Sequence, residues 1–153
     1  MFSRNENPVL LLSDSPETTK KYGRRFGELL RNGDVVYLYG EIGAGKTVFT
    51  SGLAESLGVT DYVTSPTFTI ANEYHGSLLL YHFDAYRIES PDELSETGFY
   101  DFAGGECVVV VEWAEKLRGA GPCDRIEVWI DSFDAADGLR DDMYRAIKIK
   151  FPR

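Results

Sequence analysis

The stretch YLYGEIGAGKTVF, Tyr37 to Phe49, decides the fold of this chain. An apolar and aromatic run stops at a loop with three glycines in six positions, and a lysine and a threonine follow at once. Residues Gly40 to Thr47 fit the pattern G-x-x-x-x-G-K-[ST] of a phosphate-binding loop. A strand, a glycine loop and a helix in this order are typical of an α/β domain. The alternative interpretation is a tight glycine turn with an exposed lysine.

Each residue type in the loop has a chemical reason. Glycines let backbone N–H groups approach phosphate oxygens without a Cβ in the way. The helix that follows directs the positive end of its dipole at the same place. Lys46 can neutralise the β- and γ-phosphates, and the Thr47 hydroxyl can ligate Mg²⁺. The loop residues that we predict to bind a nucleotide are Glu41, Gly43, Ala44, Gly45, Lys46, Thr47 and Val48.

Phosphoryl chemistry also needs carboxylates that hold Mg²⁺ and position water, and two acids close expected strands. Asp84 ends LLLYHFD, and Glu112 ends VVVVE. Carboxylates at the carboxyl ends of neighbouring parallel strands lie near the rim where the glycine loop lies. A solvated or helix-capping side chain is the alternative for each. A run of four valines that ends in a single acid favours a functional role for Glu112. The pattern does not decide whether Asp84 has one.

Two further candidates lie near these acids in the expected fold. The segment SPTFT, Ser65 to Thr69, falls where other P-loop NTPases sense the terminal phosphate, and Thr67 is the residue predicted for that role. A turn that enters a strand is the alternative for this segment. Trp113 follows Glu112 directly, so it lies either beside the nucleotide or among core and surface aromatics.

The remaining pattern predicts one domain over residues 1–153, with no linker. We expect an α/β, P-loop NTPase-like fold with a mixed, mostly parallel sheet, antiparallel hairpins and flanking helices. The expected strands are 9–14, buried, then 35–40, 67–74, 78–86, 107–112, 125–133 and 144–151. The expected helices are 16–32, ended by Gly33, then 46–57, 91–97 with Ser90 as its cap, and a single turn near 114–119.

Composition narrows the classes of partner. A net charge of −9 repels phosphodiester backbones, so direct binding of nucleic acid is not expected. Cys107 and Cys123 fit no disulfide or zinc spacing, and reduced thiols are expected rather than a zinc site with His75 and His82. The first residues lack the apolar length of a signal peptide or membrane span, which favours a soluble, cytoplasmic protein.

The motifs together resemble a known family. GEIGAGKTVF, SPTFTI with NEY, YHFDAYRI, PDEL and VVEWAEKL occur in the order and spacing of the tRNA threonylcarbamoyladenosine biosynthesis ATPase family, TsaE (YjeE). The resemblance runs from about Asp34 to Leu117. Glu41 stands where the family commonly has aspartate, and Val48 where it commonly has a second threonine.

The resemblance implies a small bacterial P-loop ATPase that binds ATP and Mg²⁺ and is weakly active alone. It implies action with the partner proteins TsaB and TsaD in attaching threonylcarbamoyl to the adenosine beside the anticodon, so that tRNA is met only indirectly. Trp113 would then lie beside the nucleotide. The catalytic residues would be Glu112, Lys46 and Thr67, and the metal ligands Thr47, Asp84 and Glu112.

Two functions of other classes stay open at this point. A small-molecule kinase shares the loop but needs an acceptor pocket and usually an arginine-rich lid, which is not evident in this sequence. A non-catalytic, nucleotide-gated binding module would keep Lys46 and Thr47 without needing Glu112. No arginine finger is obvious, since Arg87 is more readily explained as structural, and slow intrinsic turnover is therefore expected.

Overall fold

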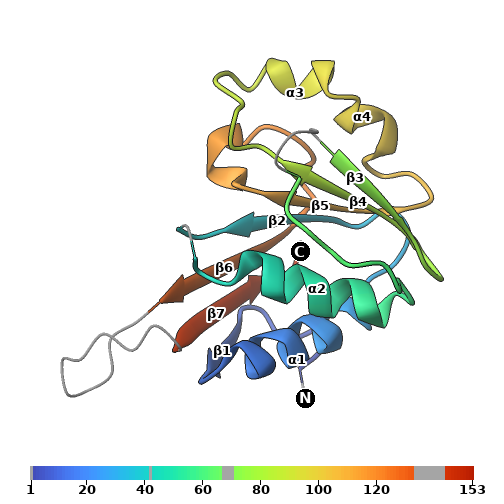
Figure 1. Cartoon of the computed structure of the whole chain (residues 1–153). Helices are drawn as coiled ribbons and strands as arrows, with labels where there is room; N and C mark the ends of the chain where they lie inside the picture. Colours follow the sequence, from blue (N-terminus) through green and yellow to red (C-terminus); the bar gives the residue numbers. More distant parts are fainter. Residues whose placement is uncertain (1, 42, 67–70, 133–143) are drawn as a thin grey trace.

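A computed structural model describes residues 2–41, 43–66, 71–132 and 144–153. Within them, seven strands form one sheet in the order β1-β7-β6-β2-β5-β4-β3 (Figure 1). The four central strands β6, β2, β5 and β4 run parallel, and antiparallel strands extend the sheet on both sides. The strands are β1 (Val9–Ser13), β2 (Val35–Tyr39), β3 (Ala71–His75), β4 (Leu79–Asp84), β5 (Val108–Glu112), β6 (Ile126–Ser132) and β7 (Arg145–Lys150).

Helices cover both faces of this sheet, which confirms the expected α/β architecture. Helices α1 (Pro16–Gly27) and α2 (Lys46–Ser56) lie side by side on one face. The short helices α3 (Glu93–Glu96) and α4 (Phe99–Phe102) cover the other face, above β4 and β5 (Figure 1). A 3₁₀ turn, η1 (Ala114–Leu117), follows β5 as expected. No helix among the described residues is long and apolar enough to span a membrane.

The valine run of β5 is buried on both faces, as four consecutive valines predict. Val108 and Val110 face α1 and α2, where they join a core that contains Phe26. Val109 and Val111 face the other side, where they pack in the core beneath α3 and α4. Because β5 lies between β2 and β4, its last residue, Glu112, has a neighbouring strand on each side.

The predicted burial of the first strand is wrong for one of its faces. Leu10 and Leu12 of β1 are 71% and 68% exposed. Within the described residues, strand β1 is at the sheet edge and pairs with β7 alone, beyond the reach of α3 and α4. A shallow cavity of about 560 Å³ lies on this uncovered face, lined in part by Trp129 and Lys148.

Helix boundaries differ from the predicted ones in two places. Ser15 caps α1 as expected, because its hydroxyl accepts a hydrogen bond from the Thr18 N–H at 3.1 Å. The helix ends at Gly27 rather than next to Gly33. Helix α3 begins only at Glu93, and the turn at Gly98 leads into α4, which was not predicted.

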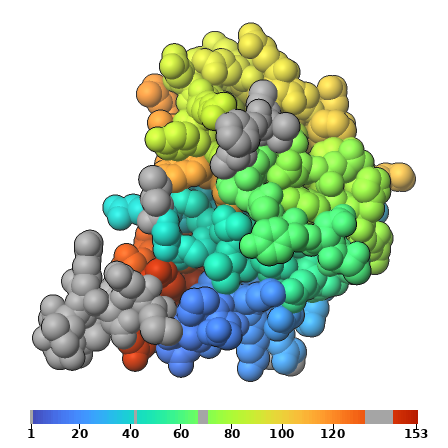
Figure 2. Space-filling view, viewed as in Figure 1, coloured from blue at the N-terminus to red at the C-terminus, as the bar shows by residue number. Residues whose placement is uncertain are grey.

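Glycine explains why α1 and α2 approach so closely. A Cβ on Gly23 would collide with the carbonyl of Phe49, and a Cβ on Gly52 would collide with the carbonyl of Lys20. Figure 2 shows the surfaces of the two helices in direct contact. Gly23, which weakens the helix by propensity, is thus required by packing.

Both predicted hairpins are present in the described part of the chain. Strand β3 pairs with β4, and β6 pairs with β7, each antiparallel. The start of the first predicted hairpin strand, residues 67–70, and the predicted acidic turn between β6 and β7 lie outside the described residues.

Candidate nucleotide-binding site

The glycine loop leaves the carboxyl end of β2 and enters α2, as the sequence pattern predicts. Gly40 is needed there because a Cβ would collide with the Ile130 carbonyl on β6. Gly45, at φ 99°, is the N-cap of α2, and its carbonyl accepts the Phe49 N–H at 2.9 Å. The N-terminus of α2 therefore opens directly onto the loop, which is the arrangement that favours anions.

Lys46 is 6% exposed, and its ammonium group folds back over the loop. Its Nζ donates to the carbonyl of Gly40 and, at 3.2 Å, to that of Glu41. The same Nζ lies 3.8 Å from the centroid of the Trp113 ring. Burial lowers the pKa of Lys46, while the carboxylates of Glu115, Glu112 and Asp84 act in the opposite direction. These contacts hold a cation beside the loop.

Glu112 is the hydrogen-bonded centre of the site. It ends β5, and its side chain is 2% exposed. Its Oε1 accepts the Thr47 hydroxyl at 3.1 Å, and its Oε2 accepts the Ser65 hydroxyl at 2.8 Å. Burial alone would raise the pKa of Glu112, but His82, Ser65 and Thr47 outweigh burial and lower it. The favoured state is a carboxylate that joins α2 to the segment before β3.

His82 lies within the sheet beside this carboxylate. Its ring is fully buried on β4, and its Nε2 is 3.4 Å from Oε1 of Glu112. Neither ring nitrogen meets hydrogen-bond criteria with any described residue. Its position next to the carboxylate comes from the pairing of β4 with β5, which sets His82 opposite Val110.

Asp84 ends β4 and lies directly opposite Glu112 in the parallel pairing. Its Oδ1 accepts the Tyr86 N–H at 2.8 Å, so one carboxylate oxygen orders the turn that follows the strand. Burial raises the pKa of Asp84; the Tyr86 N–H opposes this, and the neighbouring Glu112 carboxylate adds to it. Two acids from adjacent strands thus meet at one edge of the sheet.

Trp113 has a left-handed backbone, with φ 58°, immediately after Glu112. Its ring packs against Tyr86, with ring centroids 5.1 Å apart, and lies over the Lys46 ammonium group. The left-handed turn takes the chain away from β5 and leaves the aromatic ring at the mouth of the site.

Lys46, Thr47, Ser65, Glu112 and Trp113 border one cleft of about 370 Å³. Glu41 is exposed and does not line it, and Asp84 is beside Glu112 without lining it. Thr67 lies outside the described residues, so its predicted role stays a prediction. The lining residues are Gly43, Ala44, Gly45, Lys46, Thr47, Val48, Ser65, Glu112 and Trp113.

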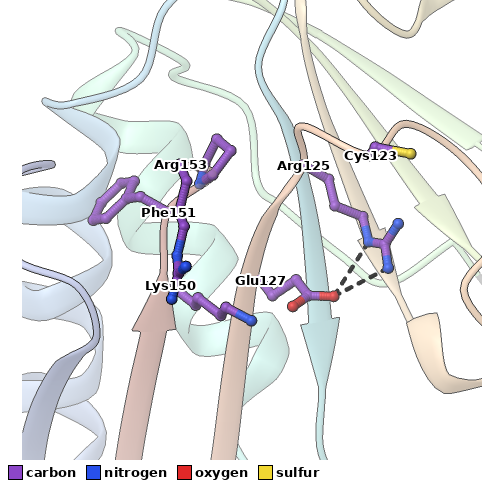
Figure 3. Close-up of a pocket in the computed structure, with 7 residues that line it drawn as sticks. Cys123, Arg125, Glu127, Lys150, Phe151 and Arg153 are labelled. Carbon is purple, nitrogen blue, oxygen red and sulfur yellow. Dashed lines mark hydrogen bonds and ion pairs between the residues drawn. The ribbon is translucent and has the colours of Figure 1, made fainter.

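A different pocket, of about 470 Å³, lies at the amino end of β6 and the carboxyl end of β7 (Figure 3). Its Arg125 is already engaged, because the guanidinium group pairs with Glu127 at 3.1 Å and donates to the Pro122 carbonyl at 2.9 Å. The exposed thiol of Cys123 lies at its edge. None of the predicted site residues that the structure describes lines this pocket.

Sequence reasoning missed Ser65 and His82 as members of the site. Ser65 belongs to the segment SPTFT, in which the pattern predicts a role for Thr67 and gives no separate signal for the serine. His82 stands two residues before Asp84 and gave no separate signal, because a histidine in an apolar strand is usually core. No cluster of three or more His, Cys, Asp or Glu side chains suited to a metal occurs among the described residues.

Comparison with known proteins identifies one family. The family model described as "Threonylcarbamoyl adenosine biosynthesis protein TsaE" matches residues 13–138. A TsaE protein of Bacillus subtilis is 42% identical over 134 residues, which cover 87% of this chain and 82% of the relative. One from Streptomyces coelicolor is 45% identical over 127 residues, covering 79% and 85%.

A solved structure agrees with the sequence comparison. The crystal structure of YdiB from Bacillus subtilis superposes with a TM-score of 0.76 at 35% sequence identity. The superposition covers 95% of this chain and 86% of that chain.

Proposed function

This chain belongs to the TsaE family of threonylcarbamoyl adenosine biosynthesis proteins, and from that membership we propose that it is a magnesium-dependent ATPase. The membership connects it with biosynthesis of threonylcarbamoyladenosine in tRNA. The proposal adds that ATP binds on the glycine loop and that hydrolysis serves the modification without performing the acyl transfer.

One observation carries this proposal: Lys46, Thr47 and Glu112 converge on a single cleft beside the glycine loop. The loop offers a helix N-terminus and a buried cation, which suit a polyphosphate. The carboxylate is hydrogen-bonded, buried and favoured in its ionised state, which suits a group that accepts a hydrogen bond from water and orients it.

The donors around the cleft fit magnesium. Thr47, Asp84 and Glu112 supply hydroxyl and carboxylate oxygens, which are the hard ligands that Mg²⁺ prefers, and we propose that they hold it directly or through water. When bound, Mg²⁺ would neutralise charge on the phosphate oxygens. Thr67 is proposed to act close to the terminal phosphate.

In the proposed reaction, water attacks the γ-phosphorus in line with the leaving oxygen. Glu112 orients that water, and Lys46 with the loop amides stabilises charge on the transferred group. Trp113 closes one side of the site near the lysine. Among the described residues that line the cleft there is no arginine, so the chain alone should turn over slowly.

A partner protein that completes the site would accelerate this slow reaction. We propose TsaD and TsaB as those partners, with tRNA met through them, in the cytoplasm. An arginine supplied in trans raises phosphoryl-transfer rates by about 10³- to 10⁵-fold in other P-loop enzymes, which sets the scale of stimulation to look for.

The Glu112→Gln variant tests the proposal. It keeps the shape of the side chain and removes the carboxylate, so we expect hydrolysis of MgATP to fall by about 10²- to 10⁴-fold, the range for loss of a positioned base. MgATP binding, measured by calorimetry, should persist. Glu106→Gln, an exposed change near the other end of β5, is the matched control and should leave both unchanged.

Three results would contradict the proposal. Absence of magnesium-dependent ATP binding by the unmodified protein would remove its basis. Binding without any hydrolysis, alone or with partners, would favour a nucleotide-gated binding module. ATP-dependent phosphorylation of a metabolite would favour a kinase.

A further inference from the structure

We propose that Arg145 is a positioning residue of the phosphate-binding loop: it holds two loop carbonyls and thereby fixes the directions of the amides that follow them, of which the Gly45 N–H is left for the ligand. The inference rests on the proposed nucleotide site and assigns that site a residue about a hundred positions away in the sequence. Arg145 begins β7, outside the strand–loop–helix unit that supplies the loop itself.

The contacts define a clamp on two consecutive carbonyls. The Nε of Arg145 donates to the Ala44 carbonyl at 2.9 Å, and its Nη2 donates to the Gly43 carbonyl at 3.0 Å. Its Nη1 donates to the Tyr144 carbonyl at 2.8 Å. All three guanidinium nitrogens are therefore engaged. Because the guanidinium group is planar and rigid, it fixes the relative orientation of the two loop carbonyls.

Holding a carbonyl also orients an amide. In a trans peptide the C=O of one residue and the N–H of the next point in opposite directions from a single plane. Arg145 holds the Ala44 carbonyl, so it sets the direction of the Gly45 N–H at the start of α2. It likewise sets the Ala44 N–H through the Gly43 carbonyl; that N–H donates to the Glu41 carbonyl at 3.1 Å and closes a turn.

The loop needs such an external restraint. Gly43 and Gly45 have φ values of 75° and 99°, and glycine samples many other conformations at little cost. A loop left free must order its backbone when the phosphates bind, and the lost conformational entropy opposes binding. The clamp orders the loop in the folded protein before the ligand arrives. Removing the clamp should therefore weaken ligand binding.

The anchor of the clamp is stiff. Arg145 is paired on both sides, opposite Ser13 of β1 and Ser132 of β6. The guanidinium group thus fixes the loop relative to the sheet.

The experiment compares Arg145→Ala and Arg145→Lys with the unmodified protein. Calorimetry with MgATP should show a dissociation constant raised about 10- to 100-fold in Arg145→Ala, the range for losing charged hydrogen bonds. Arg145→Lys should recover only part of the affinity, because an ammonium group cannot form the fork. In steady state, KM should rise more than kcat falls. Arg31→Ala, an exposed arginine before β2, is the matched control.

A second measurement needs no nucleotide. Amide hydrogen exchange should increase in peptides that cover residues 43–47 of Arg145→Ala and stay unchanged in peptides of β5. Millimolar guanidinium should restore part of the MgATP affinity of Arg145→Ala and leave that of Arg31→Ala unchanged, whereas a general loss of packing would not respond.

The outcomes separate the two proposals. If the unmodified protein does not bind MgATP, the proposed function fails, and loop exchange alone still tests the clamp. If it binds MgATP and Arg145→Ala binds equally well, the clamp is refuted. If Arg145→Ala proves unfolded, Arg145→Lys decides: full wild-type affinity in that variant would overturn the inference, and reduced affinity would support it.

Discussion

Lys46 shows how far the site is organised around contacts that a ligand would replace. Its ammonium group is divided between two loop carbonyls and the face of Trp113. A phosphate offers a full negative charge, which is a stronger partner than neutral carbonyls. We therefore infer that binding draws the lysine away from the indole ring.

The change should be visible in tryptophan emission. The chain has two tryptophans, and Trp129→Phe leaves Trp113 as the only one. Titration of this variant with MgATP should change its emission intensity and saturate, because the cation 3.8 Å from the ring centroid moves. Added Lys46→Met should abolish the change. An unaltered spectrum, with binding proven by calorimetry, would mean that the lysine stays on the ring.

At the scale of elements, the contact between α1 and α2 depends on bare backbone. Gly52 lies against the Lys20 carbonyl, and Glu55 makes ion pairs with Lys20 and Arg24 across the same contact. The pairs involve exposed side chains, and exposed pairs contribute at most about 1 kcal/mol. The close approach of the two backbones therefore restricts the sequence more strongly than the ion pairs do.

Gly52→Ala tests that contact. The added methyl group gains helix propensity, by up to about 1 kcal/mol, but it would overlap a backbone carbonyl that cannot rotate away. We expect a net loss of about 1–3 kcal/mol in the free energy of unfolding, measured by denaturant titration. Ser51→Ala, on the preceding position of α2, should change it by less than about 0.5 kcal/mol. Equal stability of the two variants would show that the helices can separate slightly without penalty.

The sequence predicted those elements whose structure depends on residues only a few positions apart. The valines of β5, the glycine loop and both hairpins were predictable because their periodicity and turn residues act over a few positions. The end of α1 and the exposure of Leu10 were not predictable, because they depend on strand order and on where helices lie. The contacts of Ser65 and Arg145 join distant segments, for which sequence spacing gives no signal.

At the scale of the whole molecule, the net charge predicts that this chain binds tRNA only weakly by itself. The net charge of −9 disfavours approach of a polyanion, even though the proposed cleft offers a triphosphate the Lys46 ammonium group and the N-terminus of α2.

We therefore expect the isolated protein to bind tRNA no more tightly than non-specific binders do, with dissociation constants weaker than about 10⁻⁶ M at physiological salt. Fluorescence anisotropy of labelled tRNA measures this directly, with a basic protein of similar size as the positive control. Binding at nanomolar concentration that weakens steeply with added salt would show a basic surface that the net charge conceals.

The backbone of Trp113 has a consequence for anyone who engineers this protein. A left-handed conformation, here with φ 58°, costs a residue with a side chain about 1–2 kcal/mol that glycine avoids. A stability-driven redesign would select glycine at this position. The glycine variant would gain thermal stability but lose the indole ring that lies against Lys46. A substitution that favours stability would therefore act against the proposed nucleotide site.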